Sequence, residues 1–276
     1  PAIINIVLDY VFIFILKWGM FGAALATSLG YIVGAVMILA YLFHPERILH
    51  VCRVKLSKKS LYLTIRNVGY MCRLGFSSFL CETAIATMMF VGNYVFIRYL
   101  GEDGVAAYSI ACYFFPIVFM VYNAIAQSAQ PILSYNYGAK CTARVRETFR
   151  LALTTAILCG AGVFLLTWIF SHQIVGMFLD SSYPAYNIAV KGLPLFASGF
   201  VFFGINIVSI GYFQSLERDC PAMIITLLRG FALILLCFWI LPIIWGSWGI
   251  WLAVPMSELL TFLFVLVIYW LENRRN

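Results

Sequence analysis

Of the chain's 276 residues, 63% are hydrophobic and only 11% are charged, and the formal net charge is +7. A soluble globular domain carries about 25% charged residues, so this sequence has too few polar side chains to cover a folded surface in water. The same figures exclude a disordered chain, which needs low hydrophobicity and high charge. The composition, with a mean hydropathy of +0.96, fits a protein whose solvent is the lipid bilayer.

Eight apolar runs approach or exceed the length of about 20 residues that a membrane-spanning helix needs. They cover residues 1–16, 22–43, 74–97, 105–133, 149–170, 188–213, 221–243 and 249–271. We therefore predict an all-α, polytopic membrane protein with eight transmembrane helices. The first run is short and starts abruptly at Pro1, so we expect it to be a helix that begins further upstream.

The cationic residues predict the orientation of these helices. Of the 18 Lys and Arg residues, 14 lie in alternate connections: residues 44–73, the segment after 133, the turn after 213 and the C-terminus. Cationic residues gather in cytoplasmic loops, so we place residues 44–73 and the C-terminus in the cytoplasm of a plasma (inner) membrane protein. This distribution argues against a nucleic-acid-binding face, and we expect no nucleic-acid partner.

The sequence offers no catalytic, cofactor or metal site. The eight Cys residues form no C-x-x-C pair, and the three His residues lack metal-ligand spacing. No convergent Ser/His/Asp set or phosphate-binding loop occurs, which argues against a membrane enzyme and against a nucleotide-driven pump. A purely structural scaffold stays open but leaves the ionisable residues within the spans unexplained.

An internal repeat predicts the domain organisation. Residues 18–26 (WGMFGAALA) and 245–253 (WGSWGIWLA) share the pattern W-G-x-aromatic-G-x-x-L-A, and Pro1-Ala2 matches Pro221-Ala222 upstream. The first two runs thus correspond to the last two, as parallel repeats of a transporter do. We predict that residues 1–43 end an N-terminal bundle lacking four upstream helices, 44–73 form a basic linker and 74–276 form a complete six-helix bundle.

Ionisable residues within the apolar runs are costly and call for an explanation. Asp9 shares a helix face with Asn5, and Thr27 enters from the next helix at similar depth. A carboxylate in hydrocarbon is stabilised when it takes up a cation, so these three residues are a candidate site for a coupling proton or cation. The alternative is a structural Asp whose carboxylate is satisfied by Asn5 and Thr27.

A second set of polar residues lies in the predicted second bundle. Glu82 and Arg229 fall at equal depth, so we expect a structural ion pair, with a second coupling carboxylate at Glu82 as the alternative. Other polar groups are candidates to line a substrate cavity together with Glu82: Asn93, Tyr122, Asn123, Gln127, Gln130 and Asn206.

Several segments resemble the MATE (multidrug and toxic compound extrusion) family. Residues 5–9 (NIVLD) and 18–27 (WGMFGAALAT) are similar to its fifth and sixth helices. Residues 130–139 (QPILSYNYGA) are similar to the signature after its eighth helix, and residues 101–108 (GEDGVAAY) to the preceding turn of one bacterial branch. The resemblance extends over essentially the whole chain.

The resemblance implies a twelve-helix antiporter that exports amphipathic, often cationic compounds in exchange for H⁺ or Na⁺, without a cofactor. The family's coupling site matches Asn5, Asp9 and Thr27, while an Asp on its first helix falls outside this chain. We expect membrane lipid and a small amphipathic substrate as partners, a monomeric full-length protein, and no transport by these 276 residues alone. The alternative is a lipid-linked oligosaccharide flippase of the same broad fold.

Overall fold

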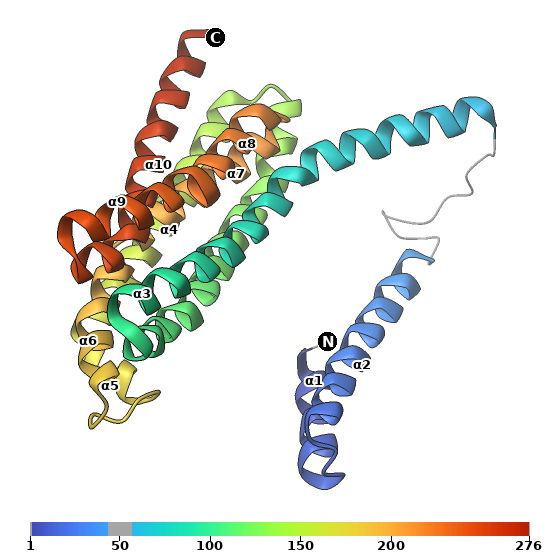
Figure 1. Ribbon diagram of the computed structural model, residues 1–276. Helices are drawn as coiled ribbons and strands as arrows, with labels where there is room; N and C mark the ends of the chain where they lie inside the picture. The colour runs from blue at the N-terminus through green and yellow to red at the C-terminus, as the bar shows by residue number, and fades with distance from the viewer. Residues whose placement is uncertain (1, 44–56, 276) are drawn as a thin grey trace. The chain divides into compact units, whose positions relative to one another are not determined.

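The computed structural model describes residues 2–43 and 57–275, and the regular elements within these ranges are all helices (Figure 1). The chain divides into two compact units, Pro1–Arg66 and Asn67–Asn276. Of the predicted basic linker, residues 44–56 lie outside the described residues. From Lys58 onward the rest of the linker is already helical, as the beginning of α3 (Lys58–Gly138).

In the first unit, two helical segments pack through small residues. α1 (Ala2–Asp9) runs directly into the π-helix η1 (Tyr10–Ile15), and α2 (Gly19–Leu42) returns along both. The buried residues of α2 recur at every fourth position: Gly22, Ala26, Gly30 and Gly34. Such a stripe lets helix backbones approach closely in a membrane, and a Cβ on Gly22 would lie 3.0 Å from the Cβ of Phe12.

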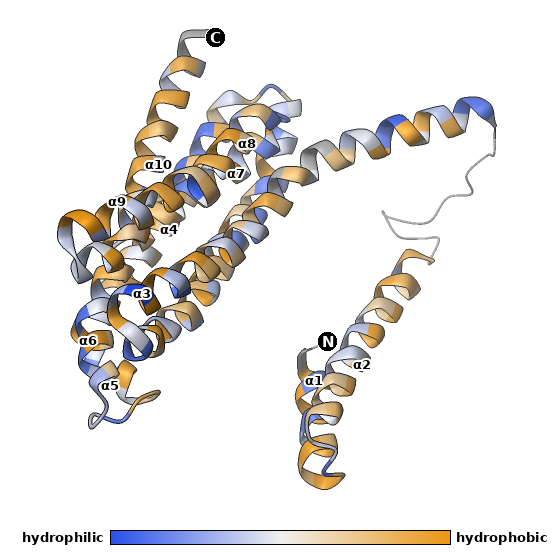
Figure 2. Cartoon of the chain, viewed as in Figure 1, coloured by the Kyte–Doolittle hydropathy of each residue, from blue (hydrophilic) through white to orange (hydrophobic). Residues whose placement is uncertain are grey.

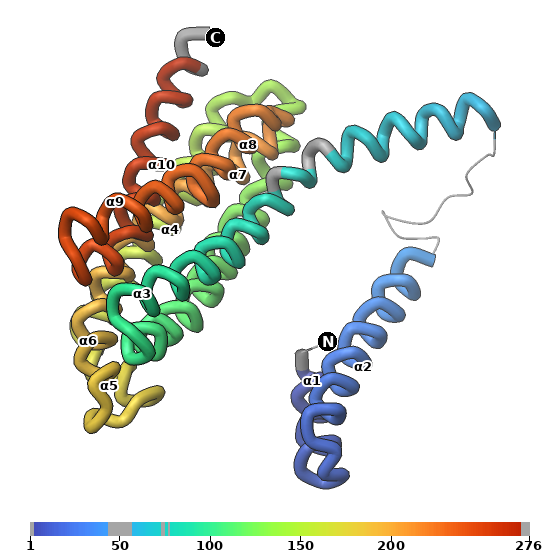
Figure 3. Tube along the Cα trace, viewed as in Figure 1, coloured from blue at the N-terminus to red at the C-terminus, as the bar shows by residue number. Residues whose placement is uncertain are grey.

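Helix α3 carries two membrane passes because its backbone breaks at Gly101. The φ of this residue is 68°, in the left-handed region that glycine adopts without strain. Figure 3 follows the chain through the resulting sharp turn. The two arms contain the predicted runs 74–97 and 105–133.

Seven further α-helices and one π-helix complete the second unit. They are α4 (Thr142–Ile169), α5 (Ser171–Gly176), α6 (Pro184–Ala197), α7 (Phe200–Ser215), α8 (Asp219–Leu227), η2 (Leu228–Ala232), α9 (Leu233–Trp245) and α10 (Ser247–Arg275). Helices α6 and α7 follow each other at a bend of 42°. At the bend, a Cβ on Gly199 would lie 2.7 Å from the Cα of Pro255, so the absence of a side chain allows α10 to pack there.

The core of the second unit is rich in aromatic side chains. The rings of Phe115 and Phe203 stack with centroids 4.7 Å apart. The buried Tyr122 hydroxyl donates to the Phe200 carbonyl oxygen at 2.8 Å, and the buried Tyr108 hydroxyl donates to the Met88 carbonyl oxygen at 3.2 Å. These bonds satisfy polar groups that have no water to bind within a bilayer.

The described helices have the length and surface of membrane spans. Among the described residues, five helices are long and apolar enough to cross a bilayer, or six if the bent pair α6–α7 is counted as one span, whereas the apolar helix Ile3–Ile15 is shorter. Large apolar side chains such as Phe90 and Trp239 are 79% and 70% exposed, and Figure 2 shows hydrophobic residues along most of α9 and α10. The chain is therefore an all-α polytopic membrane protein. The described residues of the predicted runs lie mostly on these helices, and the run 188–213 is divided by the bend between α6 and α7.

The two copies of the repeat share local backbone geometry. Gly19 and Gly246, the second residue of each W-G pair, have φ values of 56° and 58°. Both positions therefore need glycine to turn the chain tightly from one helix into the next. The second glycine of each copy is also closely packed. A Cβ on Gly249 would clash with the Leu241 carbonyl oxygen, and a Cβ on Gly22 would crowd Phe12.

Two glycines of α4 provide a matched test of the packing in the second unit. A Cβ on Gly160 would lie 2.8 Å from both the Tyr122 hydroxyl and the Cα of Val201, whereas a Cβ on Gly162 would meet open space. We expect Gly160→Ala to destabilise the protein by about 1–3 kcal/mol through overpacking. Gly162→Ala is expected to be neutral or stabilising by up to about 1 kcal/mol. Thermal unfolding in detergent measures both, and equal effects of the two variants would contradict this packing.

Candidate functional site

The first unit brings together two of the three residues predicted for cation coupling. The Asn5 side-chain amide donates to the Thr27 hydroxyl at 3.3 Å, which links α1 to α2. The Thr27 hydroxyl donates in turn to the Ala23 carbonyl oxygen at 3.0 Å. The convergence of Asn5 and Thr27 follows from the short turn that joins their helices.

Asp9 lies one helical turn beyond Asn5, at the point where α1 gives way to η1. Its side chain is half-buried, and its Oδ1 atom is buried with no hydrogen-bond partner among the described residues. A buried polar atom without a partner is costly and rare. Asp9 also precedes a π-helical turn, a feature found often at functional sites. The carboxylate thus has a spare acceptor for a proton or a small cation.

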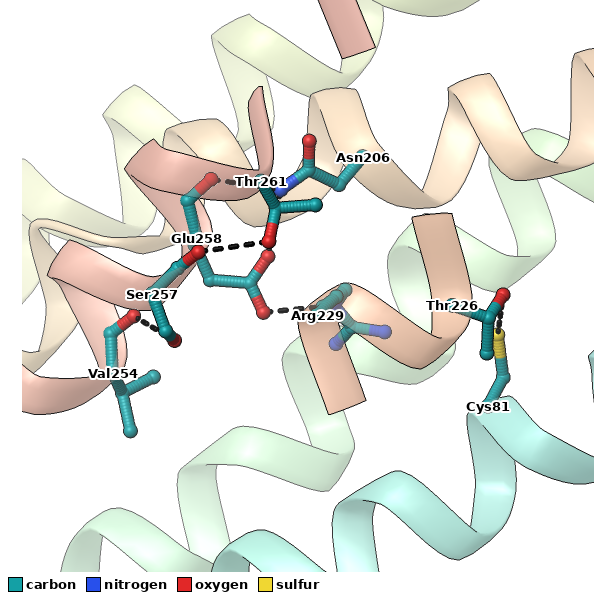
Figure 4. A network of polar contacts seen from close by, with 8 residues as sticks. All are labelled: Cys81, Asn206, Thr226, Arg229, Val254, Ser257, Glu258 and Thr261. Carbon is teal, nitrogen blue, oxygen red and sulfur yellow. Dashed lines mark hydrogen bonds and ion pairs between the residues drawn. The ribbon is translucent and has the colours of Figure 1, made fainter. Parts of the chain in front are cut away.

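The second unit contains a buried ion pair between η2 and α10 (Figure 4). Arg229 Nε donates to Glu258 Oε1 at 2.8 Å, and the two side chains are only 4% and 5% exposed. Asn206 of α7 donates from Nδ2 to Glu258 Oε2 at 2.8 Å and to the Glu258 carbonyl oxygen at 3.0 Å. The Glu258 carboxylate therefore joins three membrane-spanning segments through charge-assisted hydrogen bonds.

The surroundings of this pair are apolar, with two polar atoms left over. The Arg229 guanidinium lies 4.3 Å from the centroid of the Phe203 ring, a cation–π contact. Arg229 Nη1 and Asn206 Oδ1 are buried without a partner among the described residues. A cavity of about 10 Å³ borders Arg229 and Glu258 and is otherwise lined by apolar groups and Gly230.

The predicted ion pair between Glu82 and Arg229 is wrong, because the acidic partner of Arg229 is Glu258. Ala84 of α3 faces η2 so closely that a Cβ on Gly230 would clash with the Cβ of Ala84. Glu82 precedes Ala84 by two residues, about 160° away around an α-helix, and its side chain is exposed. Glu82 and Arg229 were matched because they lie at the same predicted depth in the membrane. Their side chains, however, do not lie on facing sides of their helices.

Glu258 is the ionisable residue that sequence reasoning missed. It lies in the middle of the apolar run 249–271, so the rule that drew attention to Asp9 and Glu82 applies to it equally. The neighbouring hydroxyl residues are a further signal, because Ser257 and Thr261 are buried and donate to backbone carbonyl oxygens within α10. A polar stretch of this kind in a membrane helix indicates a face directed towards protein.

Four of the predicted cavity residues line a common space on another side of α3. A cavity of about 140 Å³ is bordered by Glu82 and by the side-chain amides of Asn123, Gln127, Gln130 and Gln214. Gln130 Nε2 donates to Gln214 Oε1 at 3.3 Å, and Gln214 Nε2 donates to the Ser78 hydroxyl at 3.2 Å. One carboxylate among amide and hydroxyl groups is suited to a cation or to the charged end of an amphipathic cation.

The other predicted cavity residues lie elsewhere in the second unit. The Tyr122 hydroxyl is engaged by Phe200, and Asn206 is engaged by Glu258. Asn93 is half-buried in α3 and does not border the polar cavity. The prediction of one continuous cavity containing all seven residues is therefore too broad. The residues of both arms of α3 and of α7 were grouped by composition, without knowledge of which helix faces they share.

The repeat relates the two ionisable sites. In the register that matches Pro1 with Pro221, Asp9 matches Arg229. Both residues lie at π-helical turns, since η1 begins directly after Asp9 and η2 contains Arg229. The equivalent positions therefore carry opposite charges: an acid with an unpartnered oxygen in the first unit, and a base that is already paired with Glu258 in the second.

In the described part of the chain, no three His, Cys, Asp or Glu side chains lie together in a way that could hold a metal ion. The two carboxylate sites instead present single acids among amides and hydroxyls. Such donor sets suit H⁺ or Na⁺ better than the softer transition metals, which prefer imidazole and thiolate ligands.

Comparison with known proteins identifies relatives over nearly the whole chain. A family model described as MatE matches residues 78–239, more than half of the chain. The multidrug export protein MepA of Staphylococcus saprophyticus is 21% identical over 274 residues, covering 99% of this chain and 59% of the relative. MepA of Staphylococcus aureus (strain NCTC 8325) is 22% identical over 276 residues, covering 98% and 58%. The chain thus spans about three-fifths of the length of these curated relatives.

Solved structures share the fold. An outward-facing multidrug resistance MATE family transporter of the MOP superfamily matches with a TM-score of 0.83 at 22% identity, covering 96% of this chain and 59% of that one. A MOP superfamily transporter from Pyrococcus furiosus, described as having a binding pocket of reverse polarity that suggests a different function, matches with a TM-score of 0.84 at 20% identity, covering 96% and 58%.

Proposed function

Because this chain belongs to the MATE family of membrane transporters, we propose that the polypeptide containing it exports amphipathic, often cationic compounds in exchange for H⁺ or Na⁺. The observation that carries this proposal is the buried Oδ1 of Asp9, which has no hydrogen-bond partner among the described residues and lies one helical turn after the Asn5–Thr27 contact. An ionised carboxylate in a membrane helix costs at least about 2.5–3.5 kcal/mol. Uptake of a proton or cation by Asp9 relieves this cost. The free energy gained in this way is available to drive a conformational change.

Coupling requires that the cation binds the outward- and inward-facing states with different affinity. The Asn5–Thr27 hydrogen bond spans α1 and α2, so a cation that recruits either oxygen towards Asp9 changes the packing of these helices. The η1 turn next to Asp9 supports this role, because single π-helical turns inside α-helices occur frequently at functional sites. We propose that such a rearrangement links cation binding to the alternation of the transporter.

The polar cavity at Glu82 supports the recognition of cationic compounds in the second bundle. Its carboxylate and four surrounding amides offer hydrogen bonds and one negative charge, while Phe119 and Ile207 provide apolar wall. We propose that Glu82 attracts the charged end of a substrate; the alternative role is that of a second coupling carboxylate. The protein acts in the plasma membrane as a monomer, with residues 44–73 and the C-terminus on the cytoplasmic side.

A lipid-linked oligosaccharide flippase is less well supported. Such a substrate carries a pyrophosphate and favours a central groove with unpaired cationic residues. Arg229 lies within the apolar run 221–243, and its charge is neutralised by Glu258. This cation therefore offers little attraction to a phosphate.

Reconstituted transport tests the proposed exchange. The full transporter that contains this chain is placed in proteoliposomes loaded with ethidium, a fluorescent amphipathic cation, and a H⁺ or Na⁺ gradient is imposed across the membrane. We expect release of ethidium driven by one of the two gradients, at a rate at least about tenfold above that of protein-free vesicles. Release that is equal with and without either gradient would contradict secondary active exchange.

A further inference from the structure

A cavity of about 1,010 Å³ in the second unit lies outside the proposed transport sites. Its lining comes from the ends of four membrane-spanning segments: Tyr137 at the end of α3, Arg146 at the start of α4, Tyr212 near the end of α7 and Trp270 near the end of α10. Spans end at the level of the lipid headgroups. The cavity therefore opens where a span leaves the hydrocarbon, on the face that the cationic residues place in the cytoplasm.

The charged side chains that line this cavity, among the described residues, are all cationic. Lys140, Arg146 and Arg218 border the cavity, and no Asp or Glu stands among the described residues that line it. Both guanidinium groups lie within electrostatic reach of the Tyr212 hydroxyl. Lys140 and Arg146 are exposed and form no ion pair with any residue that the structure describes. Lys140 and Arg146 thus give the cavity a positive charge that no carboxylate of the described residues pairs with.

The inner wall of the cavity is aromatic and fixed in place. The Phe149 and Tyr212 rings have centroids 4.2 Å apart, and the Tyr269 ring lies 5.6 Å from Phe149 and 5.9 Å from Tyr212. The Ser134 hydroxyl donates to the Ser215 carbonyl oxygen at 3.2 Å and ties the end of α3 to the end of α7. Rings at this level of a membrane protein typically contact the glycerol and upper acyl region of lipids.

From these features we propose that the cavity binds the phosphate-bearing headgroup of an anionic phospholipid. Basic pockets between the cytoplasmic ends of membrane helices suit such headgroups. A free phosphate ion shares the charge but leaves the aromatic wall and most of the volume unfilled. The motif at residues 130–139 gains a second role in this way, because its Tyr137 and Gly138 line the cavity while its Gln130 faces the polar cavity at Glu82.

Native mass spectrometry of the full transporter in detergent tests this proposal, with dioleoyl phosphatidylglycerol compared with dioleoyl phosphatidylcholine. We expect the natural protein to prefer the anionic lipid by at least about tenfold. The double variant Lys140→Gln, Arg146→Gln is expected to bind phosphatidylglycerol about 25-fold more weakly, because each cation removed near an anionic headgroup costs about fivefold. The charge-keeping variant Lys140→Arg, Arg146→Lys should retain the preference.

The double variant Arg144→Gln, Arg150→Gln is the matched control. It removes the same charge from the same region, at exposed residues that do not line the cavity, and we expect its affinity to stay within twofold of the natural protein's. Equal losses in the two glutamine variants, or no preference for the anionic lipid, would overturn the proposal. A separate titration with inorganic phosphate distinguishes the source of the ligand, since saturable binding of phosphate without binding of lipid would also overturn it. None of these outcomes depends on transport.

Discussion

Replacing Asp9 with Asn in the full transporter is expected to reduce cation-driven efflux by at least about a hundredfold, to the rate of passive leak. Asparagine keeps the size of the side chain and most of its hydrogen bonding, but it is not protonated at physiological pH and has no negative charge to balance a bound cation. The loss follows because Oδ1 of Asp9 is a buried acceptor with no partner among the residues that the structure describes, one turn after the Asn5–Thr27 contact. Ethidium release from proteoliposomes with an imposed gradient measures the effect.

Controls separate the loss of coupling from misfolding. Asp9→Asn is expected to insert into the membrane at natural levels and to unfold at an unchanged or higher temperature, because it removes a carboxylate from a half-buried position. Asp103→Asn and Asp180→Asn remove the same charge from exposed residues and should leave efflux intact. Asn5→Ala and Thr27→Ala should give intermediate rates. Efflux by Asp9→Asn at the natural rate would eliminate Asp9 as the coupling residue.

Replacing Arg229 with Gln is expected to destabilise the protein by about 3–5 kcal/mol, because it leaves the Glu258 carboxylate buried without its counterion. Asn206 continues to donate one side-chain hydrogen bond to Glu258, but an amide does not neutralise the charge. Thermal unfolding in detergent measures the loss. An exposed substitution on the same protein, Arg150→Gln, should change stability by less than about 0.5 kcal/mol.

A double variant distinguishes the pair from two separate contributions. Glu258→Gln added to Arg229→Gln removes the second buried charge, and replacing both members of a buried pair by neutral groups is often nearly neutral in stability. We therefore expect the double variant to recover more than half of the loss seen with Arg229→Gln alone. Additive losses from the two single variants would show that Arg229 and Glu258 are not coupled, contrary to the 2.8 Å contact between them.

Periodicity and hydropathy were sufficient to predict the helical architecture. A run of about 20 apolar residues has few alternatives in a bilayer, where every backbone group must be satisfied within the helix. The repeat could also be recognised from the sequence, because the turn glycines Gly19 and Gly246 share a backbone conformation that few other residues adopt. The Asn5–Thr27 contact followed from a short turn between adjacent helices, where depth along the helix nearly determines the partner.

Partners on helices that are distant in sequence were not predictable in the same way. Depth alone matched Arg229 with Glu82, but the angle around each helix decides the contact, and η2 changes that angle by widening the helix at Arg229. The residue that does pair with Arg229 was overlooked within a run of otherwise apolar letters. Hydropathy averages conceal a single acid, whereas its desolvation cost depends on that acid alone.

Domain boundaries were obscured for a related reason. Charge marked residues 44–73 as one linker, yet α3 begins at Lys58 and continues into the first apolar arm. A helix that leaves the membrane carries its cationic residues into water without interruption, so a change in composition need not coincide with the end of a helix. The bend between α6 and α7 was likewise hidden, since the close approach of Gly199 and Pro255 involves two separate segments.

The most direct test of the account measures the movement of the cation itself. Proteoliposomes of the full transporter are given an ethidium gradient but no ion gradient, and internal pH and Na⁺ are followed with fluorescent indicators. The account predicts that ethidium moving down its gradient drives H⁺ or Na⁺ in the opposite direction, and that Asp9→Asn abolishes this movement. Ethidium crossing through the natural protein with no opposing flux of either cation would contradict it.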